Sequence, residues 1–340
     1  MATIRAWTYT SGGYPASLKY NTIPAPDEIN IQPNHIHVKI HAAAVNPVDI
    51  QLMNLPIWSI PLKAFQGTKT VSSDFSGTVI TAAPNCGFVP GDEVFGVNMA
   101  PFKQGSGTMA EVADIDLAAA PVVKKPTHWT HAQAAGLGCV FLTAHTCVDG
   151  VAPYVDPTST KRVVVLGGSS ATGIYTITLC KRRGWKVLTT CSGAKADFVT
   201  KTLGADEVID YTKASVREGV KAFKPDAIID DVGGTECLGI AKRYVTIVGD
   251  KTGRSSMGGA MTYLWSPWQW VRWAMGYVGL GERYDILNLE PKKENLEEAK
   301  ELKPNEIFID STFPFEEANK AFERLNSGRA KGKVIVEMVK

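Results

Sequence analysis

The stretch from residue 162 to residue 248 constrains the fold most, because short apolar runs alternate there with segments of helical character. The apolar runs cover residues 162–166, 186–190, 207–209, 227–231 and 244–248, and the helical patterns cover residues 174–183, 195–203 and 216–223. Strands separated by helical stretches of about 10 to 15 residues predict crossover units and therefore a parallel sheet. We expect a doubly wound α/β domain of the kind that binds nucleotides.

The first part of the chain has a different pattern, in which short strands are punctuated by glycine and proline. The expected strands cover residues 36–45, 71–82, 91–96 and 107–113, a helix is expected over 130–148, and a helix over about 315–326 precedes an apolar strand over 332–336. This last strand can return to the β domain. We therefore expect a small barrel-like β domain over residues 1–130, completed by 301–340, and a nucleotide-binding domain over 131–300.

Composition limits the kinds of binding partner and the cellular compartment that we expect. The 340 residues, 44% of them hydrophobic, can form two domains with separate cores, and 36 basic against 34 acidic residues give a formal net charge of +2. No basic patch indicates nucleic acid, so a small neutral partner fits better. The six cysteines form no CxxC pair or metal-ligand cluster. Without a signal peptide or a long apolar run, we expect a reducing, cytoplasmic location and no integral membrane association.

A glycine-rich turn lies between the apolar run 162–166 and the helical pattern that follows it. Residues 167–173 read Gly-Gly-Ser-Ser-Ala-Thr-Gly, and such small residues let backbone N–H groups approach a pyrophosphate at a helix N-terminus. The turn departs from GxGxxG, because Ser170 and Ala171 stand where glycines are expected. The alternative is a tight structural turn. We expect the pyrophosphate contacts to come from Ser169, Ser170, Ala171, Thr172 and Gly173.

The end of the next strand indicates which dinucleotide is bound. A protein specific for NAD has an Asp or Glu there to bind the ribose hydroxyls, whereas this chain continues Cys-Ser-Gly-Ala-Lys over residues 191–195. A hydroxyl from Ser192 and an ammonium from Lys195 favour the extra phosphate of NADPH. The alternatives are that Lys195 is a solvated helix residue and that Tyr211 is a half-buried core aromatic.

Several segments together resemble the medium-chain dehydrogenase/reductase superfamily, in particular its zinc-free quinone oxidoreductase branch. The matching segments are 44–49 (AVNPVD), 74–77 (DFSG), 90–96 (PGDEVFG), 134–137 (AAGL) with 142–144 (LTA), 203–211 (LGADEVIDY), 231–234 (DVGG) and 328–333 (GRAKGK). Other segments resemble the reticulon-interacting mitochondrial oxidoreductases, and the loop 167–173 resembles that of fungal trans-acting enoyl reductases. These two likenesses point to different substrates.

The resemblance implies a GroES-like β-barrel domain, a Rossmann domain and an active cleft between them. Zinc-dependent members have a Cys within the segment that corresponds to residues 45–49 and Gly-His-Glu where this chain has Ser72-Ser73-Asp74. Both ligands are missing here, and so is the four-cysteine lobe that binds structural zinc. Without a Lewis acid, hydride delivery to an activated alkene or a quinone is the more natural chemistry. Family members are often dimers, so a homodimer is a further expectation.

The resemblance also implies roles for individual residues. Asn46 and Asp49 are expected at the cleft floor, where the amide of Asn46 either donates to the acceptor or cofactor or only fixes the turn before Pro47. Asp49 is expected to be structural rather than a proton donor. Thr143 resembles the family's nicotinamide-side hydroxyl, although a helical Thr can also bond to its own backbone. The remaining cofactor contacts are expected from Ser192, Lys195 and Tyr211 at the adenosine phosphate, Asp231, Val232 and Gly233 at the nicotinamide ribose, and Arg329 and Lys331 closing over the cofactor.

Two questions stay open at this level. The aromatic segment 264–278 is interpreted as a wall for a flat apolar acceptor, as packing or a subunit contact, or as a peripheral membrane surface. The sequence identifies no residue as the proton donor. The leading hypothesis is an NADPH-dependent reductase of enones, enals, enoyl groups or quinones; the alternatives are a dedicated enoyl reductase for carrier-bound acyl chains and an NADPH-binding regulatory protein with little turnover.

Overall fold

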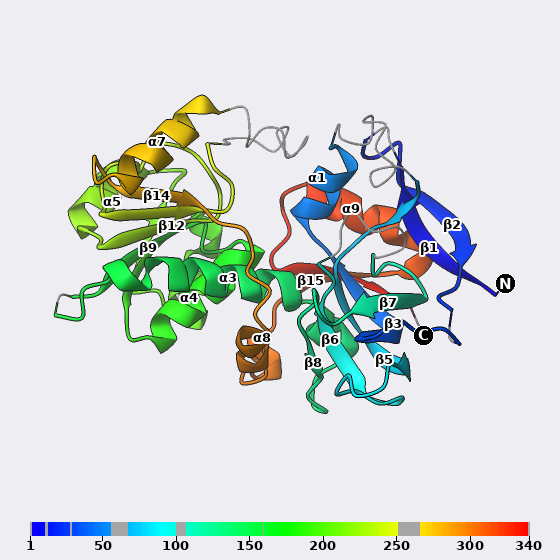
Figure 1. The fold of residues 1–340 in the computed structure, drawn as a ribbon. Helices are drawn as coiled ribbons and strands as arrows, with labels where there is room; N and C mark the ends of the chain where they lie inside the picture. The colour runs from blue at the N-terminus through cyan, green and yellow to red at the C-terminus, as the bar shows by residue number, and fades with distance from the viewer. Residues whose placement is uncertain are drawn as a thin grey trace. The chain divides into compact units, whose positions relative to one another are not determined.

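The computed structural model describes residues 2–10, 13–27, 29–55, 67–99, 107–158, 160–250 and 266–338. These residues form two compact units (Figure 1). Unit 1 holds the described residues up to Leu142 and from Pro291 onwards, and unit 2 holds those from Thr143 to Glu290. The chain passes from one unit to the other within helix α3 (Gly138–Val151) and again after Glu290, compared with the positions near 130 and 300 expected from the sequence.

Unit 2 is built on a six-stranded parallel sheet in the order β11-β10-β9-β12-β13-β14. Its strands are β9 (Arg162–Leu166), β10 (Lys186–Cys191), β11 (Glu207–Asp210), β12 (Ala227–Asp230), β13 (Arg243–Thr246) and β14 (Arg283–Ile286). The strand order reverses between β9 and β12, and the carboxyl ends of strands at such a reversal are where doubly wound sheets bind ligands. The expected Rossmann-type sheet is therefore confirmed.

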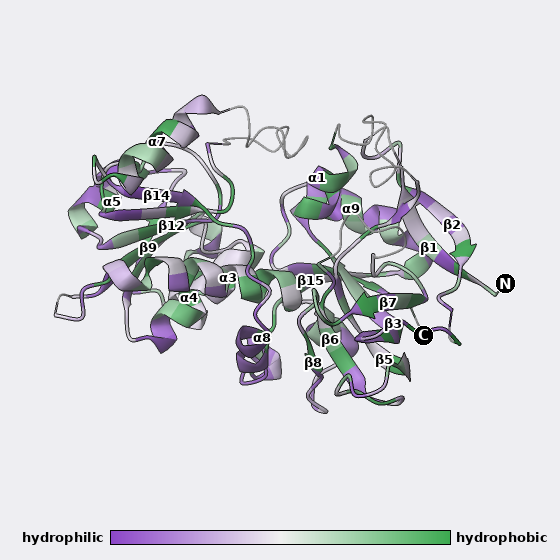
Figure 2. Ribbon diagram, viewed as in Figure 1, coloured by the Kyte–Doolittle hydropathy of each residue, from purple (hydrophilic) through white to green (hydrophobic). Residues whose placement is uncertain are grey.

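The helices of unit 2 agree with the sequence in part. They are α4 (Ala171–Arg182), α5 (Val216–Phe223) and α7 (Pro267–Tyr277), with α4 and α7 on opposite faces of the sheet (Figure 1). The expected helix over 195–203 is wrong in type: a 3₁₀ turn (Gly193–Lys195) is followed by a π-helical turn (Phe198–Thr202). Strands β9 and β12 are hydrophobic apart from Arg162 at the start of β9 and Asp230 at the end of β12, whereas helix α8 (Lys293–Ala299) of unit 1 is mostly hydrophilic (Figure 2).

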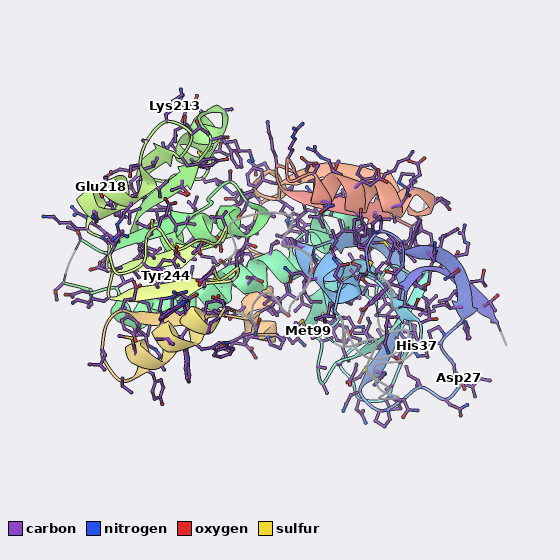
Figure 3. The ribbon with its side chains drawn as sticks, turned by 90° about the horizontal axis from the view of Figure 1, so that it is seen from above. Asp27, His37, Met99, Lys213, Glu218 and Tyr244 are labelled. Carbon is purple, nitrogen blue, oxygen red and sulfur yellow. The ribbon has the colours of Figure 1, made fainter. Side chains whose placement is uncertain are left out.

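The core of unit 2 includes a tyrosine pair that the sequence did not indicate. Tyr244 on β13 and Tyr284 on β14 are both buried, and their rings stack with centroids 5.7 Å apart. Tyr244 lies among the strands, whereas Lys213 and Glu218 lie at the outer surface of the unit (Figure 3). The hydroxyl of Tyr244 donates to Asp230 Oδ2 over 3.1 Å, which satisfies a buried carboxylate at the end of β12.

Unit 1 contains two sheets, β2-β1-β4 and β15-β16-β3-β5-β6-β8, with β7 paired to β3. The strands are β1 (Thr3–Tyr9), β2 (Lys19–Pro24), β3 (His35–Val45), β4 (Lys69–Thr70), β5 (Asp74–Ala82), β6 (Glu93–Val97), β7 (Val112–Asp116), β8 (Val122–Lys124), β15 (Ile309–Pro314) and β16 (Lys333–Glu337). As expected, the C-terminal strand β16 returns to this domain, where it pairs antiparallel with β3. Helices α1 (Pro47–Met53), α2 (His131–Ala135) and α9 (Ala318–Asn326) belong to this unit together with α8.

Two expectations for unit 1 are corrected. The single helix over 130–148 is two helices, α2 and α3, because Gly136 caps the first and Gly138 begins the second where a Cβ atom would lie 2.7 Å from Asp74 Oδ1. The strand over 107–113 is β7, which begins at Val112. The residues before it pair elsewhere, since Thr108 and Met109 donate to the backbone of Ser72 and Val71.

Candidate functional site

The turn after β9 has a backbone that only glycine permits. Gly167 has a φ of 85°, and a Cβ atom on Gly173 would lie 2.3 Å from the carbonyl oxygen of Gly167. A Cβ atom on Gly168 would meet Thr189 Oγ1 at 2.0 Å. The turn therefore brings the start of α4 against the end of β9, at the edge of the sheet where the strand order reverses.

Ser170 explains why this turn works without the expected glycines. Its side chain caps α4 by accepting a hydrogen bond from the Gly173 N–H at 2.9 Å. The N–H groups of Ala171 and Thr172 lie in the first turn of the helix and have no acceptor within it. Within the predicted segment Ser169 to Gly173, the Ser170 N–H donates to the Gly167 carbonyl and the Gly173 N–H donates to Ser170. The backbone N–H groups of Ala171 and Thr172 therefore remain as donors at the helix N-terminus, which suits a pyrophosphate.

The residues predicted for the adenosine phosphate lie at the ends of the next two strands. Ser192 and Lys195 are half-buried in the turn after β10, and the backbone N–H of Lys195 donates to the Ser192 carbonyl over 2.8 Å. Tyr211 follows β11 and its side chain is 58% exposed, so the interpretation of Tyr211 as a half-buried core aromatic is wrong. These three residues belong to neighbouring strand ends of one sheet edge.

Asp210 is a nearby acid that sequence reasoning missed. It ends β11 rather than β10, and its carboxylate accepts hydrogen bonds from the hydroxyl and the backbone N–H of Thr212. These bonds, together with one from the Gly193 backbone, lower the pKa of Asp210. The Asp210 carboxylate therefore shapes the turn that carries Lys195.

Two buried acids lie at the end of β12 and directly after it, and their hydrogen-bond partners differ. Asp230 Oδ1 accepts from the backbone N–H groups of Val232 (3.0 Å) and Gly233 (2.7 Å), which folds the predicted ribose-side segment into a tight turn. Asp231 is buried, and among the described residues its Oδ1 has no hydrogen-bond partner. Burial and the neighbouring Asp230 raise the pKa of Asp231 to about 8. The carboxyl of Asp231 is therefore harder to ionise than that of an ordinary aspartate, which the sequence did not indicate.

In unit 1, Asn46 and Asp49 form the start of helix α1. The Asp49 carboxylate accepts a hydrogen bond from the backbone N–H of Asn46 over 2.7 Å, and Asn46 occupies the N-cap position. Both side chains are buried. Burial and the nearby carboxylate of Asp74 raise the pKa of Asp49, whereas the Asn46 backbone bond and Lys333 lower it, and the net result is a pKa of about 7.

The side chain of Asn46 belongs to a buried network that the sequence did not reveal. Its Nδ2 donates to Asp74 Oδ2 over 2.9 Å, and its Oδ1 accepts from Lys333 Nζ at 2.5 Å. Lys333 Nζ also lies 2.8 Å from Asp74 Oδ2. The segments that hold Asp74 and Lys333 were both recognised as family motifs, so their position in those motifs was the available signal.

Thr143 lies on α3, one turn beyond Cys139. The backbone N–H of Cys139 donates to Asp74 Oδ1 over 2.6 Å, so the network also holds the start of this helix. Thr143 is half-buried and belongs to unit 2. Arg329 and Lys331 are exposed in unit 1, before β16, and their closure over a cofactor stays a prediction.

The aromatic segment forms helix α7, while Leu264 and Trp265 lie outside the described residues. Trp268 and Tyr277 are each 69% exposed, and Trp270 and Trp273 are exposed as well. These side chains are therefore not packed into the core of unit 2. In the described part of the chain, no helix has the length and apolar character needed to cross a membrane, and no three His, Cys, Asp or Glu side chains converge as a metal site.

Comparison with known proteins places both units in known families. Residues 32–127 match the family described as alcohol dehydrogenase GroES-like domain, and residues 203–336 match the family described as zinc-binding dehydrogenase. The mouse protein named NAD(P)H oxidoreductase RTN4IP1, mitochondrial, is 34% identical, over 90% of this chain and 82% of its own. Trans-enoyl reductase pgmF of Aspergillus terreus is 29% identical over 99% and 97% of the two chains.

Solved structures show the same fold. The quinone oxidoreductase from Coxiella burnetii superposes with a TM-score of 0.78 at 23% identity and covers 99% of this chain and 100% of its own. A mycobacterial protein solved in complex with NADPH has a TM-score of 0.71 at 19% identity, over 98% and 100% of the chains. The likeness to these structures extends over both units.

Proposed function

The chain belongs to the medium-chain dehydrogenase/reductase superfamily, and on that premise we propose that it uses NADPH to reduce an activated C=C bond or a quinone. That it is a nicotinamide-dependent oxidoreductase follows from its relatives. The observation that carries the proposal is the glycine turn at the strand-order reversal, followed at the end of β10 by Ser192 and Lys195 in place of an acid.

The described residues fit a dinucleotide. Gly167 and Gly173 let the turn pack closely against Val232 and its own backbone, where a Cβ atom would clash, and the first turn of α4 offers backbone donors to a pyrophosphate. Lys195 adds a cation at the neighbouring strand end, which favours NADPH over NADH because the second phosphate adds negative charge. When bound, the nicotinamide supplies the hydride.

A titration of cofactor binding tests this preference. Lys195→Ala should weaken NADPH binding about tenfold or more and leave NADH unchanged, since a hydrogen bond to a charged group contributes about 1.5 to 3 kcal/mol. Lys201→Ala is the matched control, because Lys201 is 74% exposed and pairs with Asp197 one turn away. Equal weakening of NADPH and NADH binding would mean that Lys195 supports the fold and does not bind the extra phosphate. A wild type that binds NADH more tightly than NADPH would refute the preference.

The residues around Asp74 do not fit a catalytic zinc, although one matching family is described as zinc-binding. Asn46 and Asp74 are both bonded to the ammonium of Lys333, and a second cation at that place would be repelled by the first. These residues therefore hold no place for a metal in the proposed reaction. The expected result is that turnover survives incubation with a strong chelator, and a loss restored by added zinc would contradict this reading.

The chain's own residues have to orient the acceptor and satisfy negative charge on its oxygen. We assign this contact to the hydroxyl of Thr143, and we assign Asn46 to positioning, because both ends of its amide are engaged within unit 1. Asp49 is assigned a structural role, since its carboxylate is buried against the backbone of Asn46. The proton that completes the reduction then comes from solvent.

Turnover against a panel of acceptors tests the reaction. NADPH oxidation is measured with an o-quinone, a simple enone, an enal and an enoyl thioester. Turnover on any of them supports the proposal and ranks the acceptor class, and activity on the thioester alone favours the dedicated enoyl reductase, the activity named for the Aspergillus relative. If none of the four acceptors is reduced although NADPH binds, the result contradicts catalysis and favours a regulatory NADPH-binding protein. The cytoplasmic location stays a prediction, since the mouse relative is named as mitochondrial, and so does the homodimer.

A further inference from the structure

Three strand ends of unit 1 place an ammonium, a carboxylate and a carboxamide together. Lys333 begins β16, Asp74 begins β5, and Asn46 follows the last residue of β3. Because β3 pairs with both other strands, with Val334 opposite Val45 and Asp74 opposite Ala44, the three side chains meet at one end of the sheet. The side chain of Lys333 is 3% exposed and that of Asp74 is fully buried.

The charges on either side of Asn46 fix which way its amide points. An ammonium can only donate hydrogen bonds and a carboxylate can only accept them. The amide oxygen therefore faces Lys333 and the amide nitrogen faces Asp74, as the distances of 2.5 Å and 2.9 Å record. A rotation of the amide by half a turn would place like partners against each other on both sides.

The same carboxylate extends this control to helix α3. Asp74 Oδ1 accepts from the backbone N–H of Cys139 in the first turn of that helix, where a negative charge is favourable. Gly138 permits this approach, because a Cβ atom there would lie 2.7 Å from Asp74 Oδ1. Thr143 lies one turn farther along α3. The ion pair thus joins the loop of Asn46 to the helix of Thr143.

We infer that Lys333 is a positioning residue for hydride transfer, which acts through Asp74 by fixing the amide of Asn46 and the start of α3. The inference rests on the proposed function, because it assigns Lys333 a part in that reaction. A buried ion pair is by itself weak grounds for a stability role, since replacing both partners by neutral groups is often tolerated. Misplacing reacting groups by about 1 Å costs on the order of 100-fold in rate.

The experiment compares three variants with the wild type, using the acceptor that the panel identifies. Lys333→Met removes the ammonium, and the double variant Asp74→Asn with Lys333→Met removes both charges so that no buried carboxylate is left alone. Lys125→Met is the matched control, because the side chain of Lys125 is 4% exposed and its Nζ donates to the Pro126 and Trp129 carbonyls outside this network. For each protein we measure Tm, NADPH Kd, and kcat per molecule that binds NADPH.

The expected result is a fall in kcat of more than tenfold for Lys333→Met, with NADPH Kd unchanged. The double variant should recover Tm but not kcat, and Lys125→Met should lose Tm while keeping kcat. Recovery of kcat together with Tm in the double variant would overturn the inference. A kcat near the wild-type value in Lys333→Met would also overturn it, and so would a double variant that does not fold. A wild type with no turnover on any acceptor refutes the proposed function itself, before any variant is compared.

Discussion

The Asp49→Asn substitution should make unit 1 more stable at neutral pH and less dependent on pH. Asp49 is buried, and its pKa is raised from 3.8 to about 7 mainly by that burial. The asparagine amide keeps an oxygen that can accept the Asn46 backbone N–H, so the helix cap survives. What the substitution removes is the cost of ionising a buried carboxyl.

The magnitude follows from the shift. The folded state holds the Asp49 proton more tightly than the unfolded chain, so this group contributes its full stability below pH 3.8 and loses it as the pH rises to 7. A pKa shift of about three units at 1.36 kcal/mol each means that the wild type has lost about 4 kcal/mol of unfolding free energy at neutral pH. The added amide N–H₂ group offsets about 1 to 3 kcal/mol if it is left without acceptors.

Urea unfolding of both proteins between about pH 4 and about pH 8 tests this, because the slope of the stability difference reports the titration directly. The stability difference in favour of the variant should grow by about 1.4 kcal/mol per pH unit between about pH 4 and the folded-state pKa of about 7, and should stay constant above it. Parallel stability curves would refute the raised pKa. The kcat of the variant should stay near the wild-type value, and a large loss of kcat would instead make Asp49 a proton donor.

Three further outcomes are expected. Gly173→Ala should abolish NADPH binding measured by fluorescence titration, since its Cβ atom would lie 2.3 Å from the Gly167 carbonyl, and retained affinity would contradict a pyrophosphate site at this turn. Burial lowers the pKa of His131 to about 4, so wild-type stability should fall between pH 6.5 and 4 by up to about 3 kcal/mol, and a His131→Gln variant with the same acid slope would contradict this. Gly138→Ala should lower kcat without changing NADPH Kd, because it displaces Asp74; an unchanged kcat would separate Asp74 from the reaction.

Local patterns in the sequence predicted the nucleotide-binding unit closely. Strand β9 and helix α5 have the bounds that their apolar runs indicated, because a buried parallel strand and an amphipathic helix each leave a distinct period in the chain. The glycine turn was recognisable for the same reason, since strand, turn and helix are contiguous. The π-helical turn over Phe198–Thr202 was not, because its apolar spacing is that of an ordinary helix.

The candidate site in unit 1 was only partly visible. Asn46 and Asp49 are three residues apart and share one helix cap, so a motif could indicate them together. Asp74 lies 28 residues from Asn46 and Lys333 lies 259 residues from Asp74, and nothing local pairs them. The division of 130–148 into two helices had the same origin, since Gly138 begins α3 against a carboxylate from a distant strand.

The sequence by itself determined the α/β class, the parallel sheet of unit 2 and the place of its glycine turn, because these depend on periodicity and on glycines within one continuous segment. Only the tertiary structure decided that Asp231 is buried and has a raised pKa, that Tyr211 is exposed, and that Lys333 contacts Asp74 and Asn46. Burial and long-range pairing set these properties, and both depend on which distant residues surround a side chain after the chain has folded.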